Sequence, residues 1–271
     1  MANWNNLGGR GRVTDRRGLG GMAVGGGLGL TGLIIVVAFT LLSGGNITDV
    51  LSQIDTSQVQ STQVYSAEDF EGADDYKVFA STVLGSTDET WSQIFENSGE
   101  DYPEPELVLF RGSTTSACGG ATSAVGPHYC SLDETIYLDE TFFDELTRLD
   151  TEGGDVAEVY VMAHEVGHHV QHQLGLLDNA RDNEGSIQLE LQADCFAGLW
   201  AHSIRDLGVF GPGEINEAIE AAAAVGDDRV QTTVTGRVNP ETWTHGSSAD
   251  RVNWFNKGYE TGLVSECDTG I

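Results

Sequence analysis

The sequence predicts a mainly helical α+β domain that follows one N-terminal transmembrane helix. Three observations point to this fold class. Residues 19–42 form an apolar run without a charged residue, short β-rich runs lie at residues 107–110 and 135–138, and helical patterns of apolar residues fill the second half of the chain. With 271 residues, of which 39% are hydrophobic, the chain is long enough to bury a core.

The apolar run at residues 19–42 has roughly the 20-residue length that a helix needs to cross a bilayer. Four arginines precede it, so the positive-inside rule places residues 1–18 in the cytoplasm and the following chain outside. Residues 43–66 are rich in Ser, Thr and Gln and read as a linker to a single domain at 67–271. A cleaved signal peptide is the alternative, but the run is longer than a usual signal core and lacks a strong small-residue cleavage site. We therefore expect a single-pass protein of the cell membrane.

The cysteines fit a domain outside the cytoplasm. All four follow the apolar run, and an even number in an oxidising compartment predicts two disulfides. Cys118 and Cys130 would close a short loop, which leaves Cys195 to pair with Cys267 and tie a helix to the C-terminus. A zinc knuckle is disfavoured because the sequence has no Cys-x-x-Cys pair.

Acidic residues dominate the composition. Asp and Glu total 42 against 13 Lys and Arg, and the formal net charge is −29. Nucleic-acid binding is excluded on this ground, because a phosphate backbone requires a basic surface.

The first half of the domain mixes helix and strand. Apolar residues recur at roughly helical spacing across residues 69–97, which predicts two helices separated at Gly85. Two prolines followed by a β-rich run predict a strand at 107–110, and residues 135–138 predict a second strand with a short helix after it.

The second half is predicted to be helical. Apolar periodicity and flanking glycines or prolines place helices at residues 156–174, 186–207 and 214–224. A further helix lies near the C-terminus, with Ser247 or Ser248 as its N-cap and with Trp254 and Phe255 on its buried side.

The first of these helices contains the strongest motif, His-Glu-Val-Gly-His. His164 and His168 are four residues apart, so a helix presents both imidazoles on one face, where they can reach one Zn²⁺. Glu165 stands next to the first histidine and can take a proton from a metal-activated water. His168 and His172 have the same spacing, but another histidine follows His168 in place of the carboxylate, so that register lacks a base.

The third ligand is predicted on the next helix. Glu190 and Asp194 share a helix face and lie among apolar residues, so they need partners when buried. Glu190 follows His168 by 22 residues, which allows a second helix to return against the first. We expect Glu190 to bind the metal and Asp194 to accept the remaining N–H of a ligand histidine. Glu184, which we expect in the preceding loop, is the competing carboxylate.

These motifs resemble a known family. HEVGHHVQ, ELQADCFAG, THGSS and the C-terminal CDT are similar to the putative neutral zinc metallopeptidases of bacteria, which are single-anchor envelope proteins. The tandem of the two motifs also resembles the gluzincins. The resemblance implies a zincin-like, gluzincin fold with a small sheet above the active-site helix and a glutamate helix below it. It implies the same ligands, His164, His168 and Glu190, and the same roles for Glu165 and Asp194. The chain departs from the family pattern at His128, where an aromatic residue is usual, and near Gly270.

We expect a zinc-dependent endopeptidase with one Zn²⁺ per chain that cleaves peptide or protein substrates outside the cytoplasm. Glu165 would act as the general base, and His245, in a turn before Gly246, would donate a hydrogen bond to the oxyanion. The strand that carries Tyr137 would form the edge along which a peptide binds. Two alternatives stay open: a catalytically idle zinc-binding envelope protein, and a zinc amidase acting on the cell wall.

Overall fold

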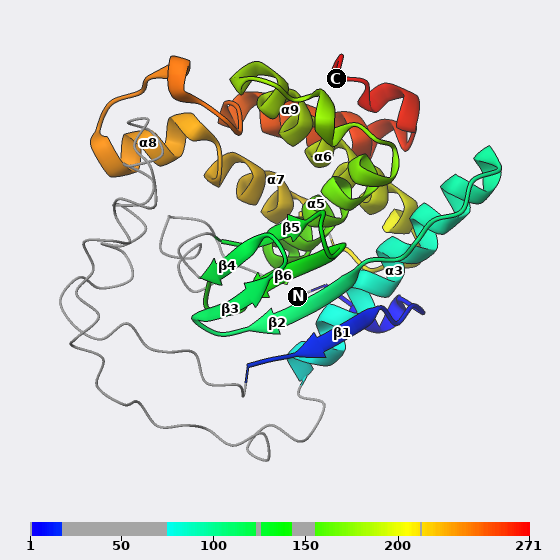
Figure 1. Cartoon of the computed structure of the whole chain (residues 1–271). Helices are drawn as coiled ribbons and strands as arrows, with labels where there is room; N and C mark the ends of the chain where they lie inside the picture. Colours follow the sequence, from blue (N-terminus) through cyan, green and yellow to red (C-terminus); the bar gives the residue numbers. More distant parts are fainter. Residues whose placement is uncertain (1, 18–74, 123–125, 143–154, 212) are drawn as a thin grey trace, which may run out of the picture.

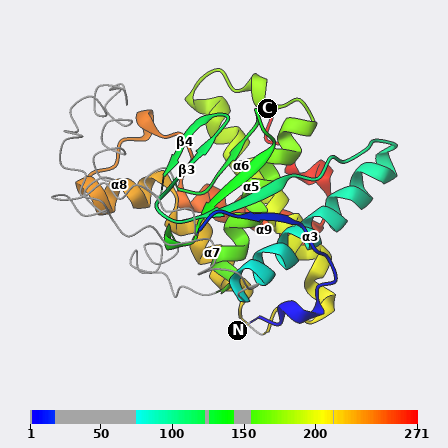
Figure 2. The same ribbon diagram turned by 60° about the horizontal axis from the view of Figure 1, so that its bottom comes forward.

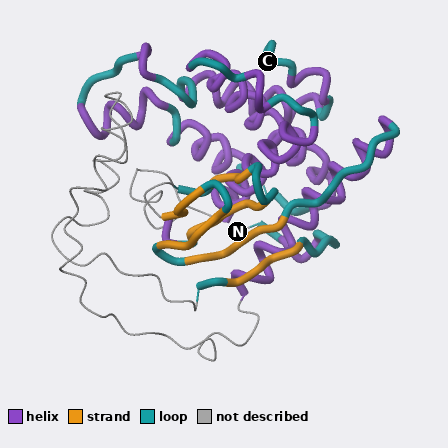
Figure 3. Tube along the Cα trace, in the orientation of Figure 1, coloured by secondary structure: helices purple, strands orange, loops and turns teal. Residues whose placement is uncertain are grey.

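The computed structural model describes residues 2–17, 75–122, 126–142, 155–211 and 213–271. This part of the chain folds into a four-stranded sheet, a separate two-stranded hairpin and a layer of helices on one side of the larger sheet (Figures 1 and 3). The strands are β1 (Arg12–Asp15), β2 (Glu106–Phe110), β3 (Ser113–Ser116), β4 (Gly119–Thr122), β5 (His128–Cys130) and β6 (Thr135–Asp139). The helices are α3 (Asp75–Ser98), α5 (Asp155–Gln173), α6 (Asn183–Ile204), α7 (Ile215–Ala224), α8 (Asp227–Thr235) and α9 (Ser248–Thr261). The predicted mixed, mainly helical fold class is confirmed.

Five short 3-10 helices connect or extend these elements within the described residues. They are η1 (Trp4–Asn6), η4 (Leu177–Asn179), η5 (Arg205–Leu207), η6 (Pro240–Thr242) and η7 (Val264–Cys267).

The large sheet has the strand order β1-β2-β6-β5. β1, β2 and β6 run parallel, whereas β5 is antiparallel to β6 and lies at the sheet edge next to α5. The two predicted strands are confirmed as β2 and β6, and both are buried, which explains their continuous apolar composition. The short helix predicted after the second strand falls mainly on residues 143–154, outside the described residues.

The N-terminal segment belongs to the folded domain. β1 pairs with β2 in parallel register, from Arg12 opposite Glu106 to Asp15 opposite Leu109. Figures 1 and 2 both show this segment beside α3. Arg17 is buried and its guanidinium donates to Glu140 at 2.7 Å. The prediction of a separate N-terminal segment at residues 1–18 is therefore wrong.

This pairing also bears on the predicted topology. A single membrane crossing between β1 and β2 would place the two strands on opposite sides of the bilayer, where they could not pair, so a cytoplasmic N-terminus with the domain outside conflicts with the sheet. The predicted span at 19–42 and the linker at 43–66 lie outside the described residues, and the span itself stays a prediction. None of the helices in the described part of the chain combines the length and the apolar character that a bilayer crossing requires.

Gly85 lies inside one continuous helix, so the prediction of two helices separated there is wrong. α3 runs from Asp75 to Ser98, and the N-terminal segment crosses it at Gly85. A Cβ at Gly85 would lie 2.1 Å from the backbone nitrogen of Arg10. Glycine is needed here for the close approach of two backbones, at the modest cost in helix stability that an interior glycine carries.

The helices of the second half confirm the predicted ranges to within a few residues, and α8 was not predicted. α6 packs most extensively against α9, and the two helices cross at Gly198 and Gly258. A Cβ at Gly198 would lie 2.0 Å from the carbonyl oxygen of Phe255, so only glycine allows this contact. Ser247 is the N-cap of α9, because its hydroxyl accepts a hydrogen bond from the N–H of Asp250.

Both predicted disulfides are present. Cys118 bonds to Cys130 and joins the β3–β4 turn to β5, while Cys195 bonds to Cys267 and joins α6 to η7. Phe255 is fully buried as predicted, whereas Trp254 is only half-buried and its ring is covered by the Lys257 ammonium at 4.5 Å.

Candidate metal centre

The two histidines of the motif and Glu190 meet between α5 and α6. The Nε2 atom of His164 lies 3.1 Å from Oε2 of Glu190, and Nε2 of His168 lies 3.4 Å from Oε1 of the same carboxylate. These three side chains offer ligand atoms within 4.8 Å of one another and could hold a metal ion. Within the described ranges they are the one group of this kind.

The second nitrogen of each histidine is held by a neighbouring side chain. Nδ1 of His164 lies 2.9 Å from Oδ1 of Asp194, as predicted. Nδ1 of His168 lies 2.9 Å from Oε1 of Gln171, whose amide nitrogen donates to the Leu189 carbonyl oxygen and to Gln192. Because both acceptors require an Nδ1–H donor, each imidazole keeps its Nε2 lone pair for a metal.

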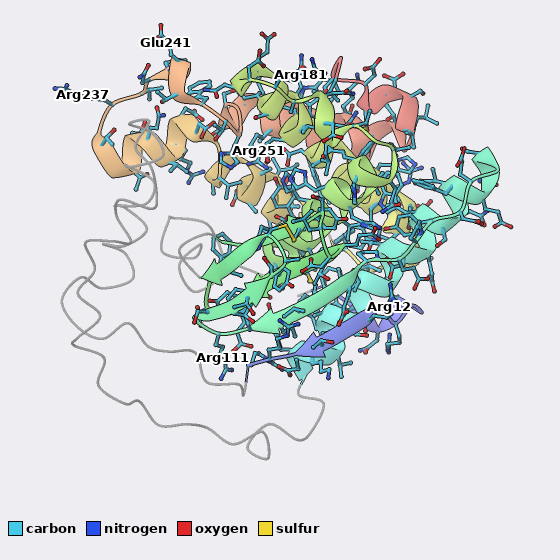
Figure 4. All side chains as sticks on the ribbon, in the orientation of Figure 1. Arg12, Arg111, Arg181, Arg237, Glu241 and Arg251 are labelled. Atoms are coloured by element: carbon cyan, nitrogen blue, oxygen red, sulfur yellow. A yellow bond between two sulfur atoms is a disulfide. The ribbon has the colours of Figure 1, made fainter. Side chains whose placement is uncertain are left out.

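Asp194 is fully buried and is the centre of a polar network behind His164. Its carboxylate accepts hydrogen bonds from the Tyr160 hydroxyl and from two nitrogens of the Arg251 guanidinium. Nη2 of Arg251 also donates to the Tyr160 oxygen at 3.1 Å. Figure 4 shows Arg251 among the helices, while the labelled Arg181, Arg237 and Arg111 lie at the periphery. A buried carboxylate in contact with a buried guanidinium is a compensated pair.

The electrostatics of the site favour a positive charge at the histidines. Burial alone lowers the pKa of His164, but the Asp194 and Glu190 carboxylates reverse this and raise the pKa to about 10. The pKa of His168 is likewise raised, since Glu190 outweighs the effect of burial. The Asp194 and Glu190 carboxylates therefore favour positive charge at this site, either as a proton on an imidazole or as a metal ion.

A cleft of about 470 Å³ opens in front of these side chains. His164, Glu165, His168 and Glu190 lie on one wall, and residues 126–129, which lead into β5 or belong to it, lie on another. Glu165 is 6% exposed and lies on the wall of the cleft beside His164. The predicted base is therefore next to the predicted ligands and on the surface of the cleft.

His245 lies at the mouth of this cleft. Its side chain is 52% exposed, and its Nδ1 is 3.4 Å from Oδ1 of Asp227. Oδ2 of Asp227 accepts hydrogen bonds from the backbone N–H groups of Thr244, His245 and Gly246, so one carboxylate holds the whole turn. Partial burial lowers the pKa of His245, but the hydrogen bond that its Nδ1 donates to Asp227 and the charge of Glu190 raise the pKa overall.

The competing candidates lie elsewhere. Glu184 is in the first turn of α6, is exposed and is not part of the ligand group. His169 and His172 both contact the Tyr129 hydroxyl through their Nδ1 atoms, at 3.0 and 2.9 Å. His169 also donates from Nε2 to the Pro103 carbonyl oxygen. His169 and His172 therefore hold β5 against α5 through Tyr129, and neither belongs to the ligand group.

Sequence reasoning missed Arg251, Gln171 and Asp227. Arg251 lies four residues before the buried Phe255 and seven before Gly258, so helical spacing places a charge on the apolar face of α9. A charge at such a position requires a buried acid as a partner, and this was the available signal. Gln171 lies three residues after His168, but Asp227 had no comparable signal because its contacts are with a distant turn.

This arrangement is typical of zinc-dependent metallopeptidases. Their metal is held by two imidazoles four residues apart on one helix and by a carboxylate from another helix, and the glutamate after the first histidine is the base. The chain belongs to the family described as "Putative neutral zinc metallopeptidase", which matches residues 2–270. It is 41% identical to the uncharacterised protein YpfJ of Escherichia coli K12 over 275 residues, covering 95% of this chain and 94% of that protein. It is 44% identical to the uncharacterised protein Rv2575 of Mycobacterium tuberculosis H37Rv over 200 residues, covering 68% and 67% of the two chains. No solved structure matches this chain.

Proposed function

We propose that this chain is a zinc-dependent endopeptidase that acts on peptide or protein substrates outside the cytoplasm. The observation that carries the proposal is the convergence of His164, His168 and Glu190 on one point beside Glu165, at the wall of an open cleft. Two imidazole nitrogens and a carboxylate oxygen suit Zn²⁺, and the two Nδ1 contacts orient both rings for it. One Zn²⁺ per chain would polarise the scissile carbonyl and lower the pKa of the attacking water.

The chain's own groups divide the proton transfers between them. The Glu165 carboxylate accepts the proton of the attacking water and then passes it to the leaving amine. His245, whose pKa is raised by Asp227, donates a hydrogen bond to the oxyanion of the tetrahedral intermediate. His245 is at the mouth of the cleft, where a small movement of its exposed side chain brings it over a bound substrate.

The substrate strand is proposed to bind along β5. The predicted edge strand was the one that carries Tyr137, but Tyr137 lies on β6, which is paired on both sides. β5 is the outer strand next to the cleft, and residues 126–129 contribute to the cleft wall. An extended peptide added to this edge would run across the ligand group.

The two disulfides support the proposed compartment. Both close within the domain, and such bonds persist in oxidising environments. Because β1 pairs with β2, the proposed location of the domain outside the cytoplasm extends to residues 12–15.

The decisive test compares the purified full chain with its Glu165→Gln variant. We expect the variant to keep about one zinc per chain and to lose casein cleavage by about 10²–10⁴-fold, the range for removal of a general base. Glu184→Gln is the matched control, because Glu184 is an exposed glutamate of α6 outside the ligand group, and it should keep full activity. Glu190→Ala should bind much less zinc. Full activity of Glu165→Gln would refute the base assignment.

The two alternatives predict different outcomes of the same assay. An idle zinc-binding protein would bind zinc but leave casein and short peptides intact. A zinc amidase would leave casein intact but release products from peptidoglycan fragments, with the same dependence on Glu165. Peptidase activity that a chelator removes and that added zinc restores would exclude the idle zinc-binding protein.

A further inference from the structure

Two glutamines connect His168 to the C-terminal segment of the protein. Nδ1 of His168 lies 2.9 Å from Oε1 of Gln171, and the Gln171 amide nitrogen donates to Oε1 of Gln192 at 3.1 Å. The amide nitrogen of Gln192 in turn donates to the backbone carbonyl oxygen of Cys267 at 3.0 Å. This glutamine relay, which consists of Gln171 and Gln192, therefore joins a histidine of α5, through α6, to η7 near the end of the chain.

Both side chains of the glutamine relay are buried, and their amides are fully engaged. Gln171 is 0% exposed and Gln192 is 6% exposed. The amide nitrogen of Gln171 makes a second hydrogen bond, to the carbonyl oxygen of Leu189 at 2.7 Å. Because a primary amide has two N–H donors, both donors of Gln171 are in use. A buried amide that loses a partner carries a desolvation penalty, so this one arrangement of the two glutamines is favoured.

Backbone carbonyl oxygens fix the direction of the relay. The Cys267 oxygen accepts and cannot donate, so the nitrogen of the Gln192 amide faces it and the oxygen of that amide faces Gln171. The Leu189 oxygen acts in the same way, so the Gln171 nitrogen faces α6 and the Gln171 oxygen faces His168. An amide oxygen requires a donor, which places a proton on Nδ1 of His168 and leaves the lone pair of Nε2 for a metal.

The C-terminal segment is attached to α6 at three successive points. Cys267 forms the disulfide with Cys195, its carbonyl oxygen accepts from Gln192, and the Thr269 hydroxyl donates to the Gln188 carbonyl oxygen at 2.9 Å. Positions 188, 192 and 195 lie on one face of the helix, because they are separated by four and three residues. Figure 1 shows this end of the chain beside α6 and α9. The disulfide thus holds the acceptor at which the relay begins.

The two histidines are oriented by different chemistry. Nδ1 of His164 contacts the Asp194 carboxylate, whose position is fixed by the Arg251 guanidinium. Nδ1 of His168 contacts a neutral amide, and a hydrogen bond between neutral partners is roughly half as strong as one to a charged group. The orientation of His168 therefore depends on the correct placement of each member of the relay.

We propose that Gln171 and Gln192 are positioning residues, through which the attachment of the C-terminal segment sets the affinity of His168 for zinc. The proposal rests on the zinc site of the proposed function but does not require peptidase activity. Without the carbonyl oxygen of Cys267 in place, the Gln192 amide loses its fixed direction, and the Gln171 amide then turns more freely. Nε2 of His168 is then presented to the metal for a smaller fraction of the time, and loss of such a partner weakens metal binding by about 10–100-fold.

The test measures the zinc Kd of the folded full chain by competition with a chromophoric chelator, and the thermal unfolding of the metal-free protein. Gln171→Met keeps the length of the side chain but removes the acceptor, and it should weaken zinc binding about 10–100-fold. Gln192→Met and the double variant Cys195→Ala/Cys267→Ala act through Gln171, so we expect a smaller, roughly several-fold loss. Gln173→Met is the matched control, because Gln173 lies on the same helix outside the relay, and it should keep the wild-type Kd.

Gln171→Glu separates positioning from a purely structural role. Its carboxylate still accepts from Nδ1 of His168, but it cannot donate to the oxygens of Leu189 and Gln192 and is repelled by both. We expect Gln171→Glu to unfold at a lower temperature than Gln171→Met and nevertheless to bind zinc more tightly, within roughly several-fold of the wild type. A purely structural role would give the weaker zinc binding to the less stable variant, Gln171→Glu, and this order would overturn the proposal.

The remaining outcomes distinguish this proposal from the proposed function. A wild-type zinc Kd in Gln171→Met refutes the positioning role even when the wild type cleaves casein. The expected order of Kd values supports it even when no peptidase activity is found. If Gln171→Met or the disulfide variant does not fold, Gln192→Met decides the question, and a wild-type Kd there refutes the link to the C-terminal segment. A wild type that binds no zinc overturns both proposals.

Discussion

Arg251 and Asp194 form a buried two-point ion pair behind His164. Nε of Arg251 donates to Oδ2 of Asp194 at 2.8 Å, and Nη2 donates to Oδ1 at 3.0 Å. The pair joins α9 to α6, and the same carboxylate contacts Nδ1 of His164. Arg251 thus balances the charge of the residue that orients His164, so we expect the stability of the fold and the affinity of the site for metal to be coupled at Asp194.

Replacement of Arg251 should therefore destabilise the protein strongly. Arg251→Met leaves the Asp194 carboxylate buried beside a neutral side chain, which costs about 3–5 kcal/mol of unfolding free energy. Arg181→Met is the control, because Arg181 is exposed and should change stability by no more than about 0.5 kcal/mol. Urea unfolding of the zinc-loaded proteins measures both. A loss below about 1 kcal/mol for Arg251→Met would mean that the ion pair is not the stabilising element.

Asp227 should control the pH range of the reaction through His245. Asp227→Asn removes the carboxylate that raises the pKa of His245, so the imidazole loses its proton at a lower pH. The alkaline limb of kcat/KM should move to lower pH, with zinc content unchanged. His245→Ala should lower kcat by about 10²-fold, as for loss of an oxyanion donor. The role assigned to the pair would be ruled out by identical pH profiles of the wild type and Asp227→Asn.

The contacts of Tyr129 should fix the width of the cleft. Its hydroxyl joins β5 to His169 and His172 on α5, and Tyr129→Phe removes both hydrogen bonds while keeping the ring. We expect a loss of about 1–3 kcal/mol, because Nδ1 of the buried His169 is left without a partner, together with a several-fold rise in KM and unchanged zinc content. Tyr137→Phe is the matched control, since its hydroxyl donates to Asp133 and does not contact α5. Equal KM values for the two variants would contradict this role.

Asp88 should make the stability of the fold depend on pH. Burial raises its pKa to about 8 in the folded protein, whereas the pKa is near the ordinary value of 3.8 when unfolded. The folded state therefore holds a proton that the unfolded state releases. This contribution to the free energy of unfolding is complete below pH 4 and is lost as the pH rises to 8, by at most about 1.4 kcal/mol per pH unit.

Urea unfolding between pH 4 and pH 8 should show this decline in the wild type and a flatter profile in Asp88→Asn. Parallel profiles would show that Asp88 does not titrate in this way.

The elements that the sequence predicted correctly depend on local spacing. His164 and His168 share a face because a helix repeats every 3.6 residues, and the same rule pairs Glu190 with Asp194. The strands β2 and β6 were visible as short apolar runs, and Ser247 was visible as a cap. The disulfides followed from the number of cysteines and the order in which they occur.

The errors have one physical origin, which is contact between segments far apart in the chain. Gly85 reads as a helix breaker until Arg10 is seen lying against it, and the basic residues near the N-terminus read as a cytoplasmic flank until β1 is seen beside β2. The short strand β1 has no pattern of its own, because its stability comes from the neighbouring strand.

The amino-acid sequence by itself determined the helix that presents His164, Glu165 and His168, since that geometry needs only the helical repeat. It also determined that a carboxylate of the next helix was available. Only the tertiary structure decided that Arg251 neutralises Asp194, that Asp227 holds the turn of His245, and that the N-terminal segment completes the sheet. These contacts join residues separated by 57, 18 and more than 90 positions, and their free energy arises only after the segments have packed.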